Sequence, residues 1–197
     1  MGVSRVRLLD IPCGDMAWMH RFLKTRDDVD YTGMDIVPEL ISNHSKSFKK
    51  YPWKFIHQDI VEQPLNESYD IILCRMMLQH LYTPDVLKVL KRFSDSGSRN
   101  LLTTNFYTFG DNADLPKSLW KGRVRCLNLE IPPFSLAPPK CMFRDGEEDD
   151  LNGRFHFLGL WDLPLRKIRK CSEKASFNLP RRNITIYSCT KWTYSQP

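Results

Sequence analysis

A short turn between a predicted strand and a predicted helix constrains this chain more than any other feature. Residues 5–15 (RVRLLDIPCGD) are apolar and β-favouring up to Asp10, and the pattern then breaks at Pro12 and Gly14. Apolar side chains follow at helical spacing: Met16, Trp18, Met19, Phe22 and Leu23. A helix that leaves such a turn directs its unpaired backbone N–H groups at whatever the turn binds. We therefore expect a nucleotide-type ligand at this turn.

A carboxylate follows this turn at the spacing that dinucleotide-binding folds use for ribose. The second apolar run, residues 29–34, ends on Asp35, 21 residues beyond Gly14. In those folds an acidic residue about 20 residues after the glycine turn accepts hydrogen bonds from ribose hydroxyls. The turn is not G-x-G-x-x-G, because Pro12 and Asp15 stand at glycine positions. Since the Asp15 carboxylate would repel a pyrophosphate, we expect a cationic or zwitterionic ligand.

Strand and helix patterns alternate five times along the first half of the chain. The further predicted elements are a helix over 37–50, strands over 53–58 and 69–74, a helix over 78–93 interrupted near Pro84, a strand over 101–105, a helix over 158–168 and a strand over 183–191 in a final hairpin that closes the sheet. Such alternation, with right-handed crossovers, predicts an α/β fold with a Rossmann-like, mostly parallel, doubly wound sheet of about seven strands.

Polar residues follow several of these predicted strands. They are Asp10, Asp35, Asp59, Cys74 with Arg75, and Asn105. An Asp after a strand is more often a turn former than a ligand, but three successive strands that end in Asp favour a binding site. Ligands of such sheets bind beyond the carboxyl ends of the strands, and all these residues fall there.

The composition predicts one globular domain, residues 1–197. With 42% hydrophobic and 12% aromatic residues, a chain of 197 residues can bury a full α/β core. No apolar run approaches the roughly 20 residues of a membrane span, and the N-terminus lacks the apolar core of a signal peptide, so we expect a cytoplasmic protein with no membrane contact. Six cysteines without metal-ligand spacing predict free thiols and no metal site. The net charge of +6 includes no dense Lys/Arg run, so nucleic acid is not an expected partner.

Residues 106–154 are predicted to be an insertion after the fifth strand, within the single domain. The periodicity fails there while Pro, Gly and charged residues become frequent. Because the segment follows the fifth strand, we expect it to cover the ligand end of the sheet, with Trp120, Phe134 and Phe143 as apolar contacts for a substrate. For residues 147–150 a poorly ordered surface loop is an equal alternative.

Four segments occur in a characteristic order and spacing: LLDIPCGDMAWM, YTGMDIVPELI, FIHQDI and YDIILCRMMLQHL. They resemble the glycine loop, the ribose-binding loop, the adenine-binding loop and the methyl-donor border of class I S-adenosylmethionine (SAM) dependent methyltransferases. The D-I-P-C-G-D start, G-x-D-I-V-P-E-L-I, L-C-R and L-N-L-x-x-P-P-F resemble a little-characterised group of that superfamily with Pro and Cys in the glycine loop. The resemblance implies SAM as cofactor. SAM carries a sulfonium and an ammonium but no phosphate, which agrees with an acidic turn.

The resemblance also implies the residues of a cofactor site. Asp10 and Gly14 would line the methionine portion, Asp35 would bind the ribose hydroxyls, and Ile36 would flank the adenine. Asp59 would receive the adenine amino group, and the Ile60 N–H would meet a ring nitrogen. The full predicted set is Asp10, Cys13, Gly14, Asp15, Asp35, Ile36, Asp59, Ile60 and Cys74. Neither cysteine has an evident activating base, so both are expected to be small buried residues.

The predicted activity is methyl transfer to a small-molecule or glycan-type acceptor. An oxygen acceptor is favoured because CRMM replaces the D/N-P-P-Y sequence of amino-group methyltransferases. His80 is the candidate base, with an ordinary pKa of about 6.5, and Arg75 is the candidate anchor for a carboxylate or phosphate. For His80 the alternative is a hydrogen-bonded structural role.

Other functions stay open at this point. Pro12 removes a backbone N–H from the turn, so a non-catalytic scaffold or regulatory subunit with the same fold is one alternative. A methyltransferase that acts on RNA or protein is another. An NAD-linked oxidoreductase is disfavoured by the missing glycines.

Overall fold

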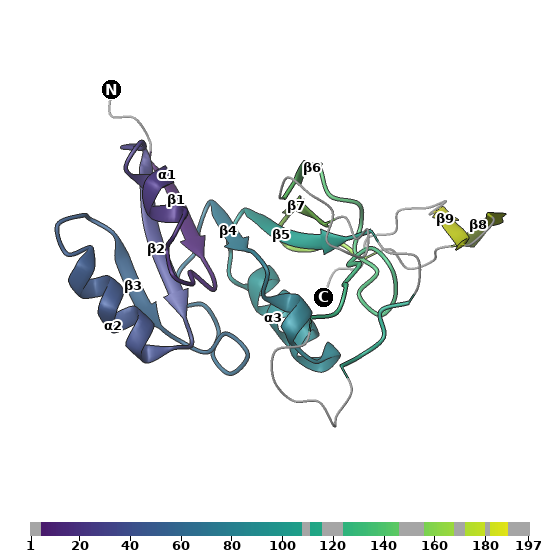
Figure 1. Cartoon of the computed structure of the whole chain (residues 1–197), viewed down its shortest axis with the longest axis horizontal. Coiled ribbons are helices and arrows are strands. Elements are labelled where there is room, and N and C mark those ends of the chain that lie inside the picture. The colour runs from purple at the N-terminus through teal and green to yellow at the C-terminus, as the bar shows by residue number, and fades with distance from the viewer. Residues whose placement is uncertain are drawn as a thin grey trace.

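The computed structural model describes residues 5–107, 111–115, 124–145, 156–167, 172–179 and 182–188. The main sheet has seven strands in the order β3-β2-β1-β4-β5-β7-β6 (Figure 1). Its strands are β1 (Val6–Asp10), β2 (Val29–Asp35), β3 (Lys54–His57), β4 (Ile71–Cys74), β5 (Asn100–Phe106), β6 (Cys141–Arg144) and β7 (His156–Asp162). Strands β1 to β5 are parallel, and β7 is antiparallel to both β5 and β6. The predicted Rossmann-like, mostly parallel α/β sheet is confirmed.

Helices cover both faces of the sheet. They are α1 (Met19–Leu23), α2 (Pro38–Ser47) and α3 (Thr83–Asp95), with a short 3-10 helix, η1 (Leu78–His80), before α3. Buried residues of α1 and α2 pack in one apolar cluster with Leu8, whereas those of α3 pack in a second cluster with Leu9. Because successive side chains of a strand point to opposite faces, α1 and α2 cover one face and α3 covers the other. The strand order changes direction between β1 and β4: β2 and β3 lie on one side of β1, and β4 and β5 on the other. Such folds bind ligands at this position.

The region between β4 and β5 shows why the predicted helix is interrupted. After η1 the backbone is extended at Leu81 and Tyr82. Helix α3 then begins at Thr83, with Pro84 in its first turn, where a missing N–H costs nothing. The interruption predicted near Pro84 is therefore confirmed.

The helix predicted over residues 158–168 is wrong. Residues 156–162 form β7, which lies between β5 and β6 and pairs with β5 from Asn100↔Asp162 to Phe106↔His156. A short apolar run that is buried between two strands cannot be distinguished from a buried helix by periodicity alone. The Trp161 ring lies over Gly159, where an added Cβ would come within 2.4 Å of it, and the Trp161 indole N–H donates to the Ala137 carbonyl at 2.7 Å.

The final hairpin does not close the main sheet, contrary to the sequence prediction. Strands β8 (Ser172–Leu179) and β9 (Arg182–Ser188) pair with each other in a separate two-stranded sheet (Figure 1). The position beside β7 is filled by β6, which comes from the segment that was predicted to be an insertion.

The described parts of residues 106–154 are more than a cover. Besides supplying β6, they bury side chains in the α3-side core, namely Leu127, Leu129, Phe134 and Leu136. Phe134 is fully buried and belongs to the core, so its predicted role as a substrate contact is wrong. Phe143 is 52% exposed. Trp120 and residues 147–150 lie outside the described residues.

Among the described residues, no helix is long and apolar enough to cross a bilayer.

Candidate functional site

The turn after β1 is fastened to the end of β2. The Cys13 N–H donates to the Met34 carbonyl at 2.9 Å, and the Gly14 N–H donates to Asp35 Oδ2 at 3.1 Å. The other carboxylate oxygen of Asp35 accepts the Val37 N–H at 3.1 Å. Asp35 therefore links the glycine turn to the start of α2. A carboxylate has about four acceptor positions, and the described residues fill two of those of Asp35.

Gly14 adopts the left-handed conformation that favours glycine, with φ of +55°. An added Cβ would have nothing within 4 Å, so the space beside the turn is open. The Gly14 carbonyl lies 2.7 Å from Nε2 of His44, a buried residue of α2. Because a carbonyl can only accept, Nε2 of His44 carries the hydrogen. Sequence reasoning missed His44, since its position in the middle of α2 gives no sign of this long-range bond.

Asp10 lies deeper than the sequence suggested. Its side chain is only 3% exposed, and Oδ2 accepts the Tyr31 hydroxyl hydrogen at 2.9 Å. Burial raises the pKa of Asp10 to about 7, although the Tyr31 hydrogen bond and the charge of Arg75 both lower it. This carboxyl group therefore changes its charge near neutral pH. Tyr31, on β2, was not predicted as a site residue.

The remaining predicted cofactor residues differ in accessibility. Ile36 is 56% exposed beside the buried Asp35. Asp15 is exposed and accepts the Ala17 N–H at 2.9 Å. Asp59 accepts the Val61 N–H at 2.8 Å, whereas the Ile60 side chain is buried in the α3-side core. The structure thus joins Asp10, Gly14 and Asp35 around the turn, and Asp59 with Ile60 follows the neighbouring strand β3.

Both predicted site cysteines are buried. Burial raises the pKa of Cys13 to about 12 and that of Cys74 to about 12. The Cys74 carbonyl accepts the Thr103 hydroxyl hydrogen at 2.7 Å. Neither thiol is therefore activated as a nucleophile, which matches the expectation of small buried residues.

Arg75 is paired with a residue that sequence reasoning did not select. Its Nε donates to Asp145 Oδ2 at 2.9 Å and its Nη2 donates to Oδ1 at 3.0 Å. The guanidinium also lies 5.6 Å from the centroid of the Trp18 ring. His156 Nε2 lies 3.9 Å from Asp145 Oδ2. The predicted anchor for a substrate anion already has a carboxylate partner within the protein.

His80 lies in η1 and is exposed. The intervening Met76 has φ of +55°, a strained value for a residue with a side chain. The Met76 N–H donates to the Thr104 hydroxyl at 2.9 Å, which holds this backbone against β5. Arg75 directly follows β4, and His80 lies a few residues further on, after the bend at Met76.

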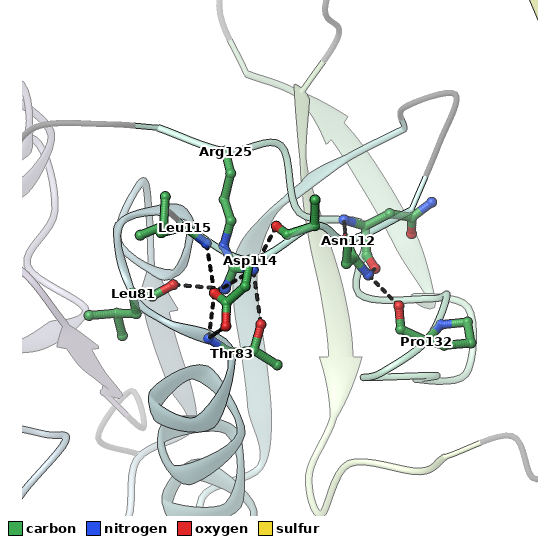
Figure 2. A network of polar contacts seen from close by, with 9 residues as sticks. Leu81, Thr83, Asn112, Asp114, Leu115, Arg125 and Pro132 are labelled. Carbon is green, nitrogen blue, oxygen red and sulfur yellow. Dashed lines mark hydrogen bonds and ion pairs between the residues drawn. The ribbon is translucent and has the colours of Figure 1, made fainter. Parts of the chain in front are cut away.

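A buried arginine anchors part of the 106–154 segment to the start of α3. The Arg125 guanidinium donates to the Leu81 carbonyl at 2.7 Å, the Ala113 carbonyl at 3.0 Å and the Thr83 hydroxyl at 3.0 Å (Figure 2). Asp114 pairs with it at 3.2 Å and accepts the Thr83 N–H at 3.1 Å. These contacts hold residues 111–115 and 124–128 beside the loop that follows β4.

A second polar group lies at the carboxyl end of β5. Glu130 accepts the Tyr107 hydroxyl hydrogen, and Asn105 Nδ2 donates to the same oxygen at 3.3 Å. Burial raises the pKa of Glu130. Asn105 Oδ1 in turn accepts the Leu129 N–H at 2.7 Å, so this group fixes the L-N-L segment against β5.

Among the described residues no group of three or more His, Cys, Asp or Glu side chains is arranged to hold a metal ion. A shallow cavity lies at the opposite, amino-terminal edge of the sheet, lined by Arg5, Val6, Asp70, Ile71, Arg99 and Asn100. None of the predicted cofactor residues lines it.

Comparisons with known proteins agree with this fold. Residues 9–98 match the model of a family described as a methyltransferase domain. The mitomycin 7-O-methyltransferase MmcR is similar, with a TM-score of 0.60 and 15% identity over 82% of this chain and 50% of its own. The methyltransferase domain of bacterial CtHen1-C gives a TM-score of 0.58 and 15% identity over 82% and 91% of the two chains. A search of curated proteins finds no match.

A third solved structure was determined with SAM bound. It is the magnesium protoporphyrin IX methyltransferase ChlM from Synechocystis PCC 6803, with a TM-score of 0.55 and 12% identity over 81% of this chain and 70% of its own. At such identities the likeness establishes the fold. The chain spans half or less of the length of several similar chains, between 22% and 50%. The family match covers residues 9–98, and the fold is the one that these solved methyltransferases have.

Proposed function

We propose that this protein is an enzyme that transfers a methyl group from SAM to an oxygen atom of a small-molecule or glycan acceptor. The observation that carries the proposal is the acidic glycine turn, in which buried Asp10 and Asp35 flank an open Gly14. Carboxylates at this position favour a ligand with an ammonium or sulfonium group and disfavour a pyrophosphate. The family match over residues 9–98 supports the same conclusion.

The residues at the turn fit SAM. Asp35 would accept the ribose hydroxyls at the acceptor positions that the described residues do not fill, and the exposed Ile36 can contact the adenine. Asp59 and the Ile60 N–H would hold the adenine edge, and Asp10 would act through its charge from beneath the turn. When bound, SAM supplies an electrophilic methyl carbon on a positively charged sulfur.

The protein's own contribution to the reaction is mainly positioning. Holding an acceptor in line with the reacting carbon can supply roughly 7 to 11 kcal/mol of rate acceleration. We propose that His80, exposed after β4, accepts the proton of an acceptor hydroxyl at a ring nitrogen. Arg75 can bind an acceptor carboxylate or phosphate only if that group displaces Asp145. The described part of residues 106–154 would line the acceptor side.

Binding measurements test the proposal directly. Isothermal titration calorimetry with SAM, S-adenosylhomocysteine and NAD should show binding of the first two and no binding of NAD. Asp35→Asn should weaken SAM binding by about 1.5 to 3 kcal/mol, the size of hydrogen bonds to a charged group. Asp162→Asn, in an exposed pair with Lys140 at the far end of β7, is the control. Binding of NAD, or of no nucleoside at all, would refute the enzyme proposal.

A further inference from the structure

We propose that Asp145 is a specificity-determining residue of the cofactor site. By neutralising Arg75, it lets the site accept a positively charged methyl donor. It therefore sets the preference for SAM over the product S-adenosylhomocysteine, which has no net charge and a neutral sulfur. This inference rests on the proposed function, and it assigns a role in cofactor selection to a residue that follows β6, far along the chain from the glycine turn.

Arg75 lies close to the turn because of the strand register. Strands β1 and β4 are neighbours, and Asp10 pairs with Leu73, so Arg75 follows just beyond the end of β1. Its guanidinium faces the ring of Trp18, the residue that precedes α1. The charge of Arg75 also acts on Asp10, whose pKa it lowers. The field of this arginine therefore extends to the carboxylate beneath the glycine turn.

The Asp145 carboxylate neutralises the positive charge of Arg75. Both of its carboxylate oxygens accept hydrogen bonds from the Arg75 fork, at 2.9 and 3.0 Å, and its side chain is 10% exposed. A bidentate pair of this kind is stronger and more fixed than a single contact. Among the described residues, His156 is a second titratable group that faces Asp145, at 3.9 Å. The Asp145 N–H donates to the His156 carbonyl at 3.4 Å, which places the carboxylate beside the first residue of β7.

SAM and S-adenosylhomocysteine differ in the charge of their sulfur atom. SAM carries a positive sulfonium, whereas S-adenosylhomocysteine carries a neutral thioether. An Arg75 without its partner would repel SAM and leave the product nearly unaffected. If the sulfonium binds roughly 12 Å from the guanidinium, the repulsion of two unit charges at an effective dielectric constant of about 20 corresponds to about a tenfold change in affinity.

Calorimetric titration of SAM and S-adenosylhomocysteine into four proteins tests this inference. In Asp145→Asn, SAM affinity should fall about tenfold while product affinity changes by less than about twofold. In Arg75→Gln the ratio of SAM to product affinity should rise, because an unpaired carboxylate remains. The double variant Arg75→Gln with Asp145→Asn has the net charge of the wild type, so its ratio should return to the wild-type value.

Several results would overturn the inference. Equal losses of SAM and product affinity in Asp145→Asn, or a ratio in the double variant that stays as low as in Asp145→Asn, would show a purely structural role. The control is Asp162→Asn, which removes a carboxylate from the other end of β7 and should leave the ratio unchanged. Melting temperatures identify a misfolded variant. If Asp145→Asn misfolds, Arg75→Gln alone still shows whether the ratio of SAM to product affinity rises, as the inference requires. A wild-type protein that binds neither nucleoside refutes the proposed function itself.

Discussion

The buried Asp10 makes a quantitative prediction for the pH dependence of stability. Its pKa is about 7 in the folded protein against an ordinary value of 3.8. Between these values the folded state holds the proton more tightly than the unfolded chain, so the stability that Asp10 contributes is present below pH 4 and is lost as the pH rises to 7. A difference of about three pKa units at about 1.4 kcal/mol each amounts to roughly 4 kcal/mol.

Asp10→Asn isolates this contribution. The amide oxygen can still accept the Tyr31 hydroxyl hydrogen, but the side chain carries no charge at any pH. Urea denaturation of both proteins should therefore show similar stabilities near pH 4, and Asp10→Asn should become the more stable protein by several kcal/mol at pH 8. Because Asp10 is almost fully buried, solvent screening should reduce this difference little.

A positively charged ligand bound near Asp10 should reduce the loss of stability that ionisation of Asp10 causes. If SAM binds beside the ionised carboxylate, the stabilisation that it gives the wild type should increase between pH 6 and 8, and Asp10→Asn should lack that increase. Parallel pH profiles for the two proteins without ligand would refute the assignment of a raised pKa to Asp10.

Two further predictions concern His80 and Arg125. Once an acceptor is identified, His80→Ala should lower turnover by about 10² to 10⁴-fold with unchanged SAM affinity. Turnover is measured by the release of S-adenosylhomocysteine. A folded variant with wild-type turnover removes His80 from the mechanism. Arg125→Met should lower the free energy of unfolding by about 2 to 3 kcal/mol in urea, because buried carbonyls lose their donor. Lys91→Met, which breaks an exposed pair with Asp95, is its control and should change stability by less than about 1 kcal/mol.

The parts of the site that depend on local pattern could be predicted from the sequence. The break at Gly14 and the carboxylate of Asp35 are encoded within short runs, and the structure joins them by one hydrogen bond. Alternation of strand and helix patterns sufficed for the parallel half of the sheet, because each buried strand is flanked by turn residues.

The contacts that were missed join residues far apart in the chain. Arg75 and Asp145 are separated by 70 positions, and nothing in either local sequence indicates the other. The same holds for Tyr31, whose hydroxyl bonds to Asp10 from the neighbouring strand. Strand β7 was missed for a different reason, since its apolar run is equally compatible with a buried helix.

The insertion of β7 between β5 and β6 has a consequence for synthesis of the protein. While the chain is being made, β5 emerges long before its antiparallel partner, because Phe106 pairs with His156. Until then the outer edge of β5 presents unpaired backbone N–H and C=O groups, which can pair with another nascent chain. We therefore expect ribosome-bound intermediates that stop before residue 156 to require chaperones, and the sheet to complete its edge only in a late folding step.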